Sequence, residues 1–130
     1  MKKNLLIVLI AIIIVSAIGI GIIMSKKEAI QETEKNIEII VYDNNELAIY
    51  EDKVSTKSNK LLTALKEIEN LEIVYENSQY GAFIISINSI KQENDYYWNY
   101  YVNGEYVTVG ISDYEIKNND KFEFHLEKFE

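Results

Sequence analysis

The sequence predicts an α+β protein, in which a small antiparallel β-domain with one packed helix follows an N-terminal transmembrane helix. The first observation is a continuous run of 20 residues, from Leu5 to Met24, in which only Ser16 is polar. The second is that the roughly 100 residues after it are enough for one domain with a single hydrophobic core. The third is that these residues contain short β-type runs separated by turn residues, with one segment of helical periodicity.

The apolar run has the length of a membrane-spanning helix. At about 1.5 Å of rise per residue it spans about 30 Å, which is the thickness of the hydrocarbon core of a bilayer. A cleaved signal peptide is the alternative, but its apolar core is shorter, roughly 7–15 residues, and small residues follow it. Here the small residues lie within the run. We therefore predict an uncleaved anchor, with cleavage left open as the alternative.

This anchor divides the chain into four predicted parts: a cytoplasmic tip (1–4), the transmembrane helix (5–24), a charged stalk (25–36) and a β-domain (37–130). Lysines flank both ends of the helix, so positive charge alone does not decide its orientation. The chain has no cysteine, which excludes a lipid-modified cysteine as the anchor and excludes disulfides and thiol chemistry.

The β-domain is acidic. All 21 acidic residues follow the apolar run, whereas nine of the 13 lysines lie beyond Lys27, which leaves a net charge near −12. Such a surface disfavours nucleic acids and anionic lipids as partners. Arginine is absent, so the bidentate clamping of phosphate or carboxylate that arginine provides is not available.

The β-domain begins with a predicted hairpin. Ile37 to Asp43 (IEIIVYD) is rich in β-formers, and Glu46 to Val54 is the second strand. Between them, Asp43-Asn44-Asn45 has turn chemistry, because Asn and Asp tolerate positive φ and bond their own backbone.

A helix is predicted next, from a cap at Ser58 or Asn59 to about Glu69. Its apolar residues fall on one face of a 3.6-residue period: Leu61, Leu62, Leu65 and Ile68. Because a helix this short is not stable alone, it must pack on a sheet.

The middle of the domain is predicted as two strands with a loop between them. Leu71 to Tyr75 is the first strand, Asn77 to Gly81 is the loop, and Phe83 to Ile90 is the second strand. A polar turn, Lys91 to Asp95, follows.

The last third contains the strongest local signal. Tyr96 to Val102 is predicted to pair with Glu105 to Val109 through Asn103-Gly104, since both positions of a two-residue hairpin turn need positive φ. Asp113 to Asp120 is a predicted loop. The final strand places three apolar residues on one face: Phe122, Phe124 and Leu126.

The segment from Gly110 to Phe129, GISDYEIKNNDKFEFHLEKF, resembles the end of the C-terminal β-domain of transcobalamin and intrinsic factor. That family closes with a Gly-small-x-x-Tyr stretch, a polar turn and an alternating strand. The run from Trp98 to Gly104 (WNYYVNG) and the helix from Leu61 to Leu65 (LLTAL) resemble related domains of bacterial extracytoplasmic proteins. The resemblance covers roughly Ile37 to Glu130. It implies antiparallel sheets with one packed helix in a β-grasp-like arrangement, on a single-pass protein of the cell membrane whose domain is extracytoplasmic.

The chain also departs from that family. Transcobalamin holds its ligand between a large helical barrel and this β-domain, and nothing in this sequence can form such a barrel. In addition, Asn118-Asn119-Asp120 stands where a glycine is usual, although Asn tolerates the left-handed conformation. The resemblance therefore leaves corrinoid capture as an alternative that needs a partner.

Aromatic residues mark the predicted binding face. Eight of the ten tyrosines lie between Tyr75 and Tyr114. The strand from Tyr96 to Val102 carries large rings on both faces, so it needs a cover on each side. The alternative interpretation is that Trp98 and its neighbours are core residues. We predict a site that binds a ligand or a protein partner through four residues, because rings bury much area at low entropic cost: Tyr97, Trp98, Tyr101 and Tyr106.

Other candidate sites are weaker. The single histidine, His125, lies between two glutamates, and we predict a surface residue in place of a metal ligand. The acidic residues Asp113, Glu115 and Asp120 lack the regular spacing of a calcium loop. No glycine-rich phosphate loop, serine elbow or recognisable triad is present. We therefore predict no enzymatic activity, no metal and no cofactor, with cobalamin as the alternative left open above.

These observations lead to a membrane-anchored extracytoplasmic binding or interaction module as the main functional prediction. A structural protein of the cell envelope without a small ligand is the first alternative. Corrinoid capture together with a partner is the second. The identity of the ligand does not follow from the sequence.

Overall fold

A computed structural model of the chain describes residues 33–128. The predicted transmembrane helix and almost all of the predicted stalk lie outside these residues. Within residues 33–128, no helix is long and apolar enough to span a membrane.

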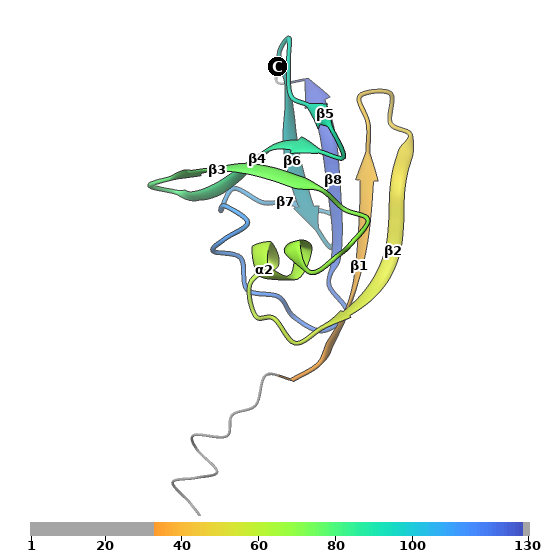
Figure 1. The fold of residues 1–130 in the computed structure, drawn as a ribbon, viewed down its shortest axis with the longest axis vertical. Coiled ribbons are helices and arrows are strands. Elements are labelled where there is room, and N and C mark those ends of the chain that lie inside the picture. Colours follow the sequence, from red (N-terminus) through yellow and green to blue (C-terminus); the bar gives the residue numbers. More distant parts are fainter. Residues whose placement is uncertain (1–32, 129–130) are drawn as a thin grey trace, which may run out of the picture. The chain divides into compact units, whose positions relative to one another are not determined.

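The largest element is a five-stranded sheet with the strand order β2-β1-β8-β6-β7 (Figure 1). Its central strand, β8, is the final alternating strand of the sequence. The five strands are β1 (Lys35–Tyr42), β2 (Ala48–Thr56), β6 (Tyr96–Val102), β7 (Glu105–Tyr106) and β8 (Lys121–Lys128). The predicted first hairpin and the predicted Asn103-Gly104 turn are both present, with φ of 52° at Asn103 and 85° at Gly104.

The sheet is mixed, which corrects the prediction of antiparallel pairing throughout. β1 runs parallel to β8, with Ile39 opposite Phe122 and Val41 opposite Phe124. Short turns specify the pairing of strands that are neighbours in sequence. The contact between the first and last strands is instead decided by burial of their apolar faces, which local patterns do not reveal.

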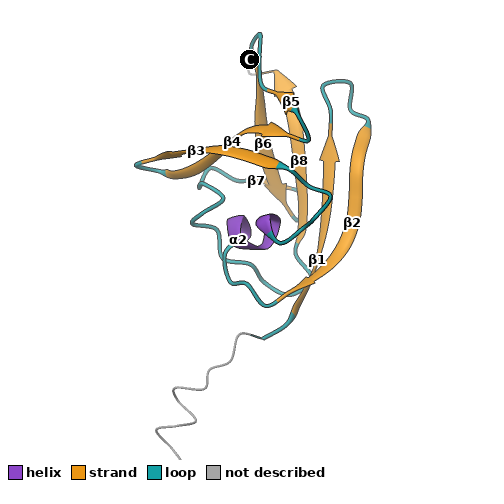
Figure 2. Cartoon of the chain, viewed as in Figure 1, coloured by secondary structure: helices purple, strands orange, loops and turns teal. Residues whose placement is uncertain are grey.

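A second sheet has three strands in the order β3-β4-β5, and it lies on the same side of the large sheet as the helix (Figure 2). The strands are β3 (Ile73–Ser78), β4 (Gly81–Ile87) and β5 (Ile90–Lys91). The predicted loop at 77–81 is wrong, because β3 and β4 form a hairpin with a two-residue connection. The Ser78 hydroxyl donates to the carbonyl of Gly81 (3.0 Å) and accepts from the Tyr80 N–H (3.0 Å), which closes this turn.

The predicted helix is present but shorter than expected, as α2 (Leu61–Lys66). Its N-cap residue is Lys60, which makes no side-chain cap bond, so the predicted cap at Ser58 or Asn59 is wrong. Carbonyl groups of the loop before β8 cap the helix instead. The Leu61 N–H donates to the carbonyl of Tyr114 (3.1 Å), and the Leu62 N–H donates to that of Ile111 (2.9 Å).

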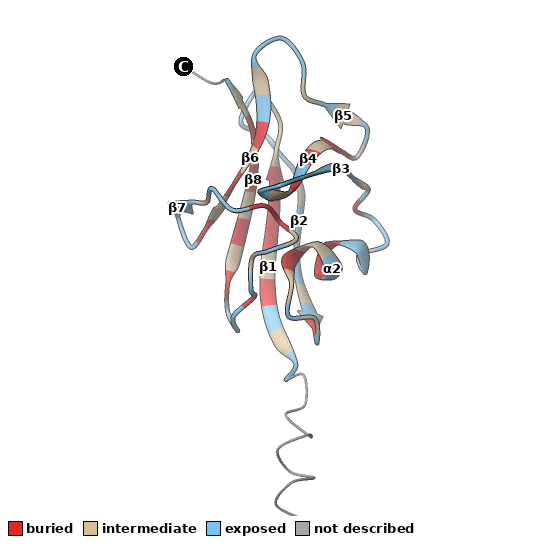
Figure 3. Ribbon diagram, turned by 90° about the vertical axis from the view of Figure 1, so that its left-hand side faces the viewer, coloured by how far each residue is buried: buried red, intermediate tan, exposed pale blue. Residues whose placement is uncertain are grey.

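The hydrophobic core lies between the large sheet on one side and α2 with β4 on the other (Figure 3). The largest fully buried side chains come from all of these layers: Phe122, Phe124, Ile39, Leu61, Leu65, Ile87, Ile111 and Val41. The predicted apolar faces of the helix and of the last strand are therefore confirmed.

A buried carboxylate organises the loop before β8. Asp120 accepts hydrogen bonds from the Asn103 side chain (2.9 Å), the Tyr114 hydroxyl (3.2 Å) and the Lys117 N–H (2.9 Å). Burial, followed by the neighbouring Asp120 charge, raises the pKa of Tyr114. Asn119 has φ of 69°, as predicted for an asparagine in place of the glycine of the related family. This carboxylate therefore ties the β6–β7 turn to the start of β8.

Candidate ligand-binding cleft

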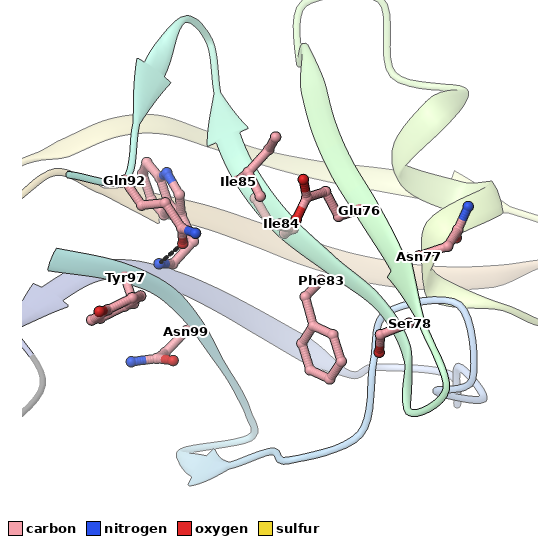
Figure 4. Close-up of a pocket in the computed structure, with 10 residues that line it drawn as sticks. Glu76, Asn77, Ser78, Phe83, Ile84, Ile85, Gln92, Tyr97 and Asn99 are labelled. Atoms are coloured by element: carbon pink, nitrogen blue, oxygen red, sulfur yellow. Dashed lines mark hydrogen bonds between the residues drawn. The ribbon is translucent and has the colours of Figure 1, made fainter. Parts of the chain in front are cut away.

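A cleft of about 530 Å³ opens between the β3–β4 hairpin and the first half of β6 (Figure 4). Its size lies in the range of small-ligand pockets. Ten residues line it: Glu76, Asn77, Ser78, Phe83, Ile84, Ile85, Gln92, Tyr97, Trp98 and Asn99.

The cleft exists because two strand edges are only partly paired. β6 pairs along its whole length with β8, but on its other edge β7 pairs only with Tyr101 and Val102. β5 likewise pairs with β4 only at Ser86 and Ile87. Within residues 33–128, no strand fills the remaining space between the two edges. Side chains from both strands therefore border an opening that the fold leaves in place.

Two aromatic rings flank this opening. Phe83 comes from β4 and is 40% exposed, and Tyr97 comes from β6 and is 45% exposed. Figure 4 shows both rings beside the cleft, on opposite strands. Solvent-exposed aromatic rings on facing walls give a ligand apolar surface to cover.

Polar groups lie beside the rings. The Gln92 side-chain oxygen accepts a long hydrogen bond from the Trp98 N–H (3.4 Å), shown dashed in Figure 4, and no other described residue uses its NH₂ group. Asn99 donates from its NH₂ group to Glu127 (3.1 Å), which leaves its oxygen available. Glu76 is the only charged residue of the lining, and it forms no ion pair among the described residues. The cleft thus offers both donors and acceptors, with one negative charge.

Of the four predicted site residues, only Tyr97 and Trp98 line this cleft. Trp98 belongs to the hydrophobic core, since it is 7% exposed and its indole N–H donates to the carbonyl of Ile90 (2.9 Å). Trp98 therefore lines the cleft as a core residue, whereas Tyr97 is a half-exposed one. A direct role of Trp98 in binding stays a prediction.

Tyr101 and Tyr106 do not line the cleft, although they lie on the face of the large sheet opposite the core, which Tyr97 shares. Their rings meet edge to face at 5.6 Å, and Tyr101 also meets His125 at 5.1 Å. His125 stacks on Tyr42 at 4.5 Å, so these four residues form one group, which we call the outer-face cluster. Tyr106 is 51% exposed, whereas the Tyr101 hydroxyl is engaged with Glu127 (2.7 Å).

The outer-face cluster contains one strongly perturbed group. The hydrogen bond to Glu127, together with partial burial and the Glu127 charge, raises the pKa of Tyr101 to about 12. His125 lies 3.3 Å from Glu123, but no third ligand joins them. Within residues 33–128, no three His, Cys, Asp or Glu side chains gather as a metal site. Asp113, Glu115 and Asp120 are not brought together: Glu115 pairs with Lys60 (3.4 Å), and Asp120 is used by the loop.

Sequence reasoning missed the β4 side of the cleft. Phe83 was assigned to an alternating strand without a functional role, and Gln92 was placed in a polar turn. The signal in the sequence was weak, because an aromatic residue in such a strand is ordinarily core. Only the folded structure, in which Phe83 is 40% exposed, shows that its face of β4 is uncovered.

Comparisons with known proteins agree with this architecture. The family model described as "Domain of unknown function (DUF4430)" matches residues 58–128, which is more than half of the chain. No curated protein sequence matches significantly.

Two solved structures share the fold. A protein from Ruminococcus gnavus ATCC 29149, described as a candidate metal-binding protein, aligns with a TM-score of 0.66 at 19% identity, over 74% of this chain and 99% of that one. Haptocorrin in complex with Cbi aligns with a TM-score of 0.65 at 19% identity, over 76% of this chain and 26% of haptocorrin. The chain thus spans about a quarter of haptocorrin. The predicted resemblance to the transcobalamin-type C-terminal domain is confirmed. At this identity the likeness establishes a small mostly-β domain with one short helix, and nothing about ligands.

Proposed function

Since the chain belongs to the DUF4430 family, whose description assigns no activity, we propose from its geometry that it is an extracytoplasmic binding module. Residues 5–24 would anchor it in the cell membrane as a single-pass protein, and the cleft beside Phe83 and Tyr97 would receive a ligand. The observation that carries this proposal is an open cleft of about 530 Å³ with exposed rings on both walls and amide side chains that keep a free donor or acceptor within the described residues. Concave sites with apolar walls and a few convergent polar groups are the usual form of small-ligand sites.

Binding fits this cleft better than catalysis. Its titratable side chains are Glu76 and Tyr97, which do not form a nucleophile–base pair. The acidic domain, with no lysine in the cleft lining, also disfavours nucleic acid as a partner. The proposal is therefore a receptor-like module and not an enzyme.

The test is a ligand-induced stability shift of the full-length chain in a mild detergent. The ligands are vitamins, corrinoids, divalent ions and glycans. A ligand at 100 times its dissociation constant adds about 2.7 kcal/mol to the unfolding free energy, which is easily measured as a higher melting temperature. We expect the shift to disappear in the Phe83→Ala/Tyr97→Ala double variant.

Tyr80→Ala is the matched control, because Tyr80 is an aromatic residue that is 69% exposed at the turn of the same hairpin and does not line the cleft. It should keep the full shift. Shifts that are equal in all variants would place binding outside the cleft and contradict the proposal. A structural envelope protein, the first alternative, would show no shift with any ligand.

Corrinoid capture is the second candidate function, and the shared fold with haptocorrin in complex with Cbi favours it. Because the chain spans only 26% of haptocorrin, the proposal includes a partner that supplies the rest of the site. Titration with cobalamin alone should give at most weak binding, which becomes tight when a partner is added. Tight binding by the chain alone would remove the need for a partner.

A further inference from the structure

We infer that the cleft is a site for a neutral oligosaccharide, held between Phe83 and Tyr97 and bonded by Gln92, Asn99 and Glu76. This inference rests on the proposed function and names the ligand class of the same cleft. It follows from three properties of the lining: the aromatic walls, the mixture of donors and acceptors, and the charge.

The aromatic walls suit the apolar face of a sugar ring. The face of an aromatic ring is the negative end of its quadrupole, and it attracts the C–H groups that a pyranose presents on one side. Phe83 and Tyr97 project from different strands on either side of the cleft (Figure 4). Each ring can stack against one sugar unit, and for this reason we infer an oligosaccharide in place of a single sugar.

The polar groups match hydroxyls. A sugar hydroxyl both donates and accepts, so it needs partners of both kinds. The Gln92 NH₂ group donates, the Asn99 oxygen accepts, and the Glu76 carboxylate accepts strongly. These three groups lie on both sides of the opening and are not consumed by bonds within the described part of the domain.

The charge excludes acidic sugars. Glu76 is the only charged side chain of the lining, and no lysine is present to pair with a carboxylate, sulfate or phosphate of a ligand. An anionic ligand would lose its hydration and face a carboxylate in return, which is costly. Selectivity for neutral over anionic glycans follows directly.

An extended peptide is the competing occupant, because it could add a strand to the β4 or β6 edge. Several of the backbone groups needed for that pairing already have partners. Ala82 N–H donates to the Ser112 hydroxyl and its carbonyl accepts from Ile111 N–H, both at 2.9 Å. The Ile85 carbonyl accepts a hydrogen bond from the Gln92 N–H (3.0 Å), and the Gln92 side-chain oxygen accepts one from the Trp98 N–H. These bonds interrupt both edges, so a continuous added strand is disfavoured relative to a ligand that side chains hold, such as a sugar.

The experiment uses the full-length chain in a polyoxyethylene detergent, which carries no sugar headgroup. The neutral probes are cellotetraose, maltotetraose and tetra-N-acetylchitotetraose. Tetragalacturonate is the anionic probe, and cyanocobalamin and an uncharged pentapeptide represent the other ligand classes. Calorimetry or NMR titration measures the dissociation constants.

We expect at least one neutral tetrasaccharide to bind, with affinity reduced about tenfold or more by Phe83→Ala or Tyr97→Ala. Tyr97→Phe keeps the ring and should retain binding. Comparison with Tyr97→Ala then separates the loss of a ring contact from a loss of folding. Tyr80→Ala should bind as the unmodified chain does. Tetragalacturonate should not bind the unmodified chain, and Glu76→Gln should reduce this discrimination.

Three results would overturn the inference. If only cobalamin or the pentapeptide binds, and does so through Phe83 and Tyr97, the saccharide is wrong while the binding cleft stands. If no probe binds in a way that depends on these two rings, the cleft and the saccharide both fail. A tetrasaccharide that binds equally to the Phe83→Ala chain also contradicts the inference.

Discussion

Tyr97 and Trp98 are neighbours in β6, and the alternation of the strand gives them different surroundings. Trp98 packs into the core and donates its indole N–H to Ile90, whereas Tyr97 stands at the opening of the cleft. Tyr101 shares the Tyr97 face, but its hydroxyl is held by Glu127. The four predicted aromatic residues therefore have three different environments. Trp98 lies in the core, Tyr97 lines the cleft as an exposed residue, and Tyr101 and Tyr106 belong to the outer-face cluster.

The Tyr101 hydroxyl provides a prediction about pH. Its hydrogen bond to Glu127 raises the pKa of Tyr101 to about 12, above the ordinary value near 10. The folded state therefore holds the phenol proton more tightly than the unfolded state does. The stability that this provides is complete below about pH 10 and is lost as the pH rises through about 12. Carbon-13 NMR of the Tyr101 ring across this range measures the pKa directly.

Glu127→Gln should lower the pKa of Tyr101, because the strong charged acceptor is replaced by a neutral one. Glu123→Gln is the matched control. It removes the same charge from a residue directly opposite Tyr101 in the strand register, but one that does not bond its hydroxyl. An equal decrease in both variants would show that charge alone, and not the hydrogen bond, sets the pKa.

At the residue scale, the residues predicted from the sequence include two of the ten that line the cleft, Tyr97 and Trp98. Tyr97 stood out because aromatic residues occur on both faces of one strand. Phe83 did not, because its exposure depends on which face of β4 the rest of the fold leaves uncovered, and that is decided by packing. Gln92 and Asn99 carry no sequence signal either, since amide side chains in turns and strands are common.

At the scale of elements, backbone hydrogen bonds from the loop after β7 hold the β3–β4 hairpin in place. Ile111 N–H donates to the Ala82 carbonyl (2.9 Å), and Gly110 N–H points to the carbonyl of Tyr80 (3.4 Å). A Cβ atom at Gly110 would lie 2.7 Å from the Ala82 nitrogen and 2.8 Å from its oxygen. The glycine thus allows the loop after β7 to touch the backbone of β4, which sets one side of the cleft.

Gly110→Ala should lower the unfolding free energy by about 1–3 kcal/mol, because backbone atoms cannot move aside as a flexible side chain does. Faster amide exchange at Ile111, measured by NMR, should accompany the lower melting temperature. Gly104→Ala is the comparison: no atom lies within 4 Å of its Cβ position, so only the φ of 85° is strained. It should leave exchange at Ile111 unchanged, and a change equal to that of Gly110→Ala would argue against the steric explanation.

The elements that local signals specify were predicted well. The Asn103-Gly104 pair correctly predicted the β6–β7 turn, and the helical spacing of Leu61 and Leu65 correctly predicted the buried face of α2. The helix start was wrong because carbonyls from Ile111 and Tyr114, about 50 residues away, replace a capping side chain. Interactions of this range leave no local pattern in the sequence.

At the scale of the whole domain, the first and last strands close the fold. β1 lies parallel to β8 at the centre of the large sheet, so residues from both ends of the domain meet in the core. The parallel pairing was not predicted, because it is non-local and depends on the shared core. Because of this pairing, the segment from Ile37 to Leu126 forms one unit. That segment contains every buried apolar residue of the described region.

Deleting residues 1–32 should therefore release the domain from the membrane without unfolding it. The apolar run of 20 residues supplies the predicted membrane affinity, and none of the described core residues lies before Ile37. We expect the shortened chain in the soluble fraction, with one cooperative unfolding transition and a dispersed NMR spectrum. Ile13→Lys/Ile14→Lys in the full chain is the matched control, since each lysine costs about 3 kcal/mol at the centre of a membrane helix. A shortened chain that stays with the membrane would show that the acidic domain itself binds there, which contradicts the anchor.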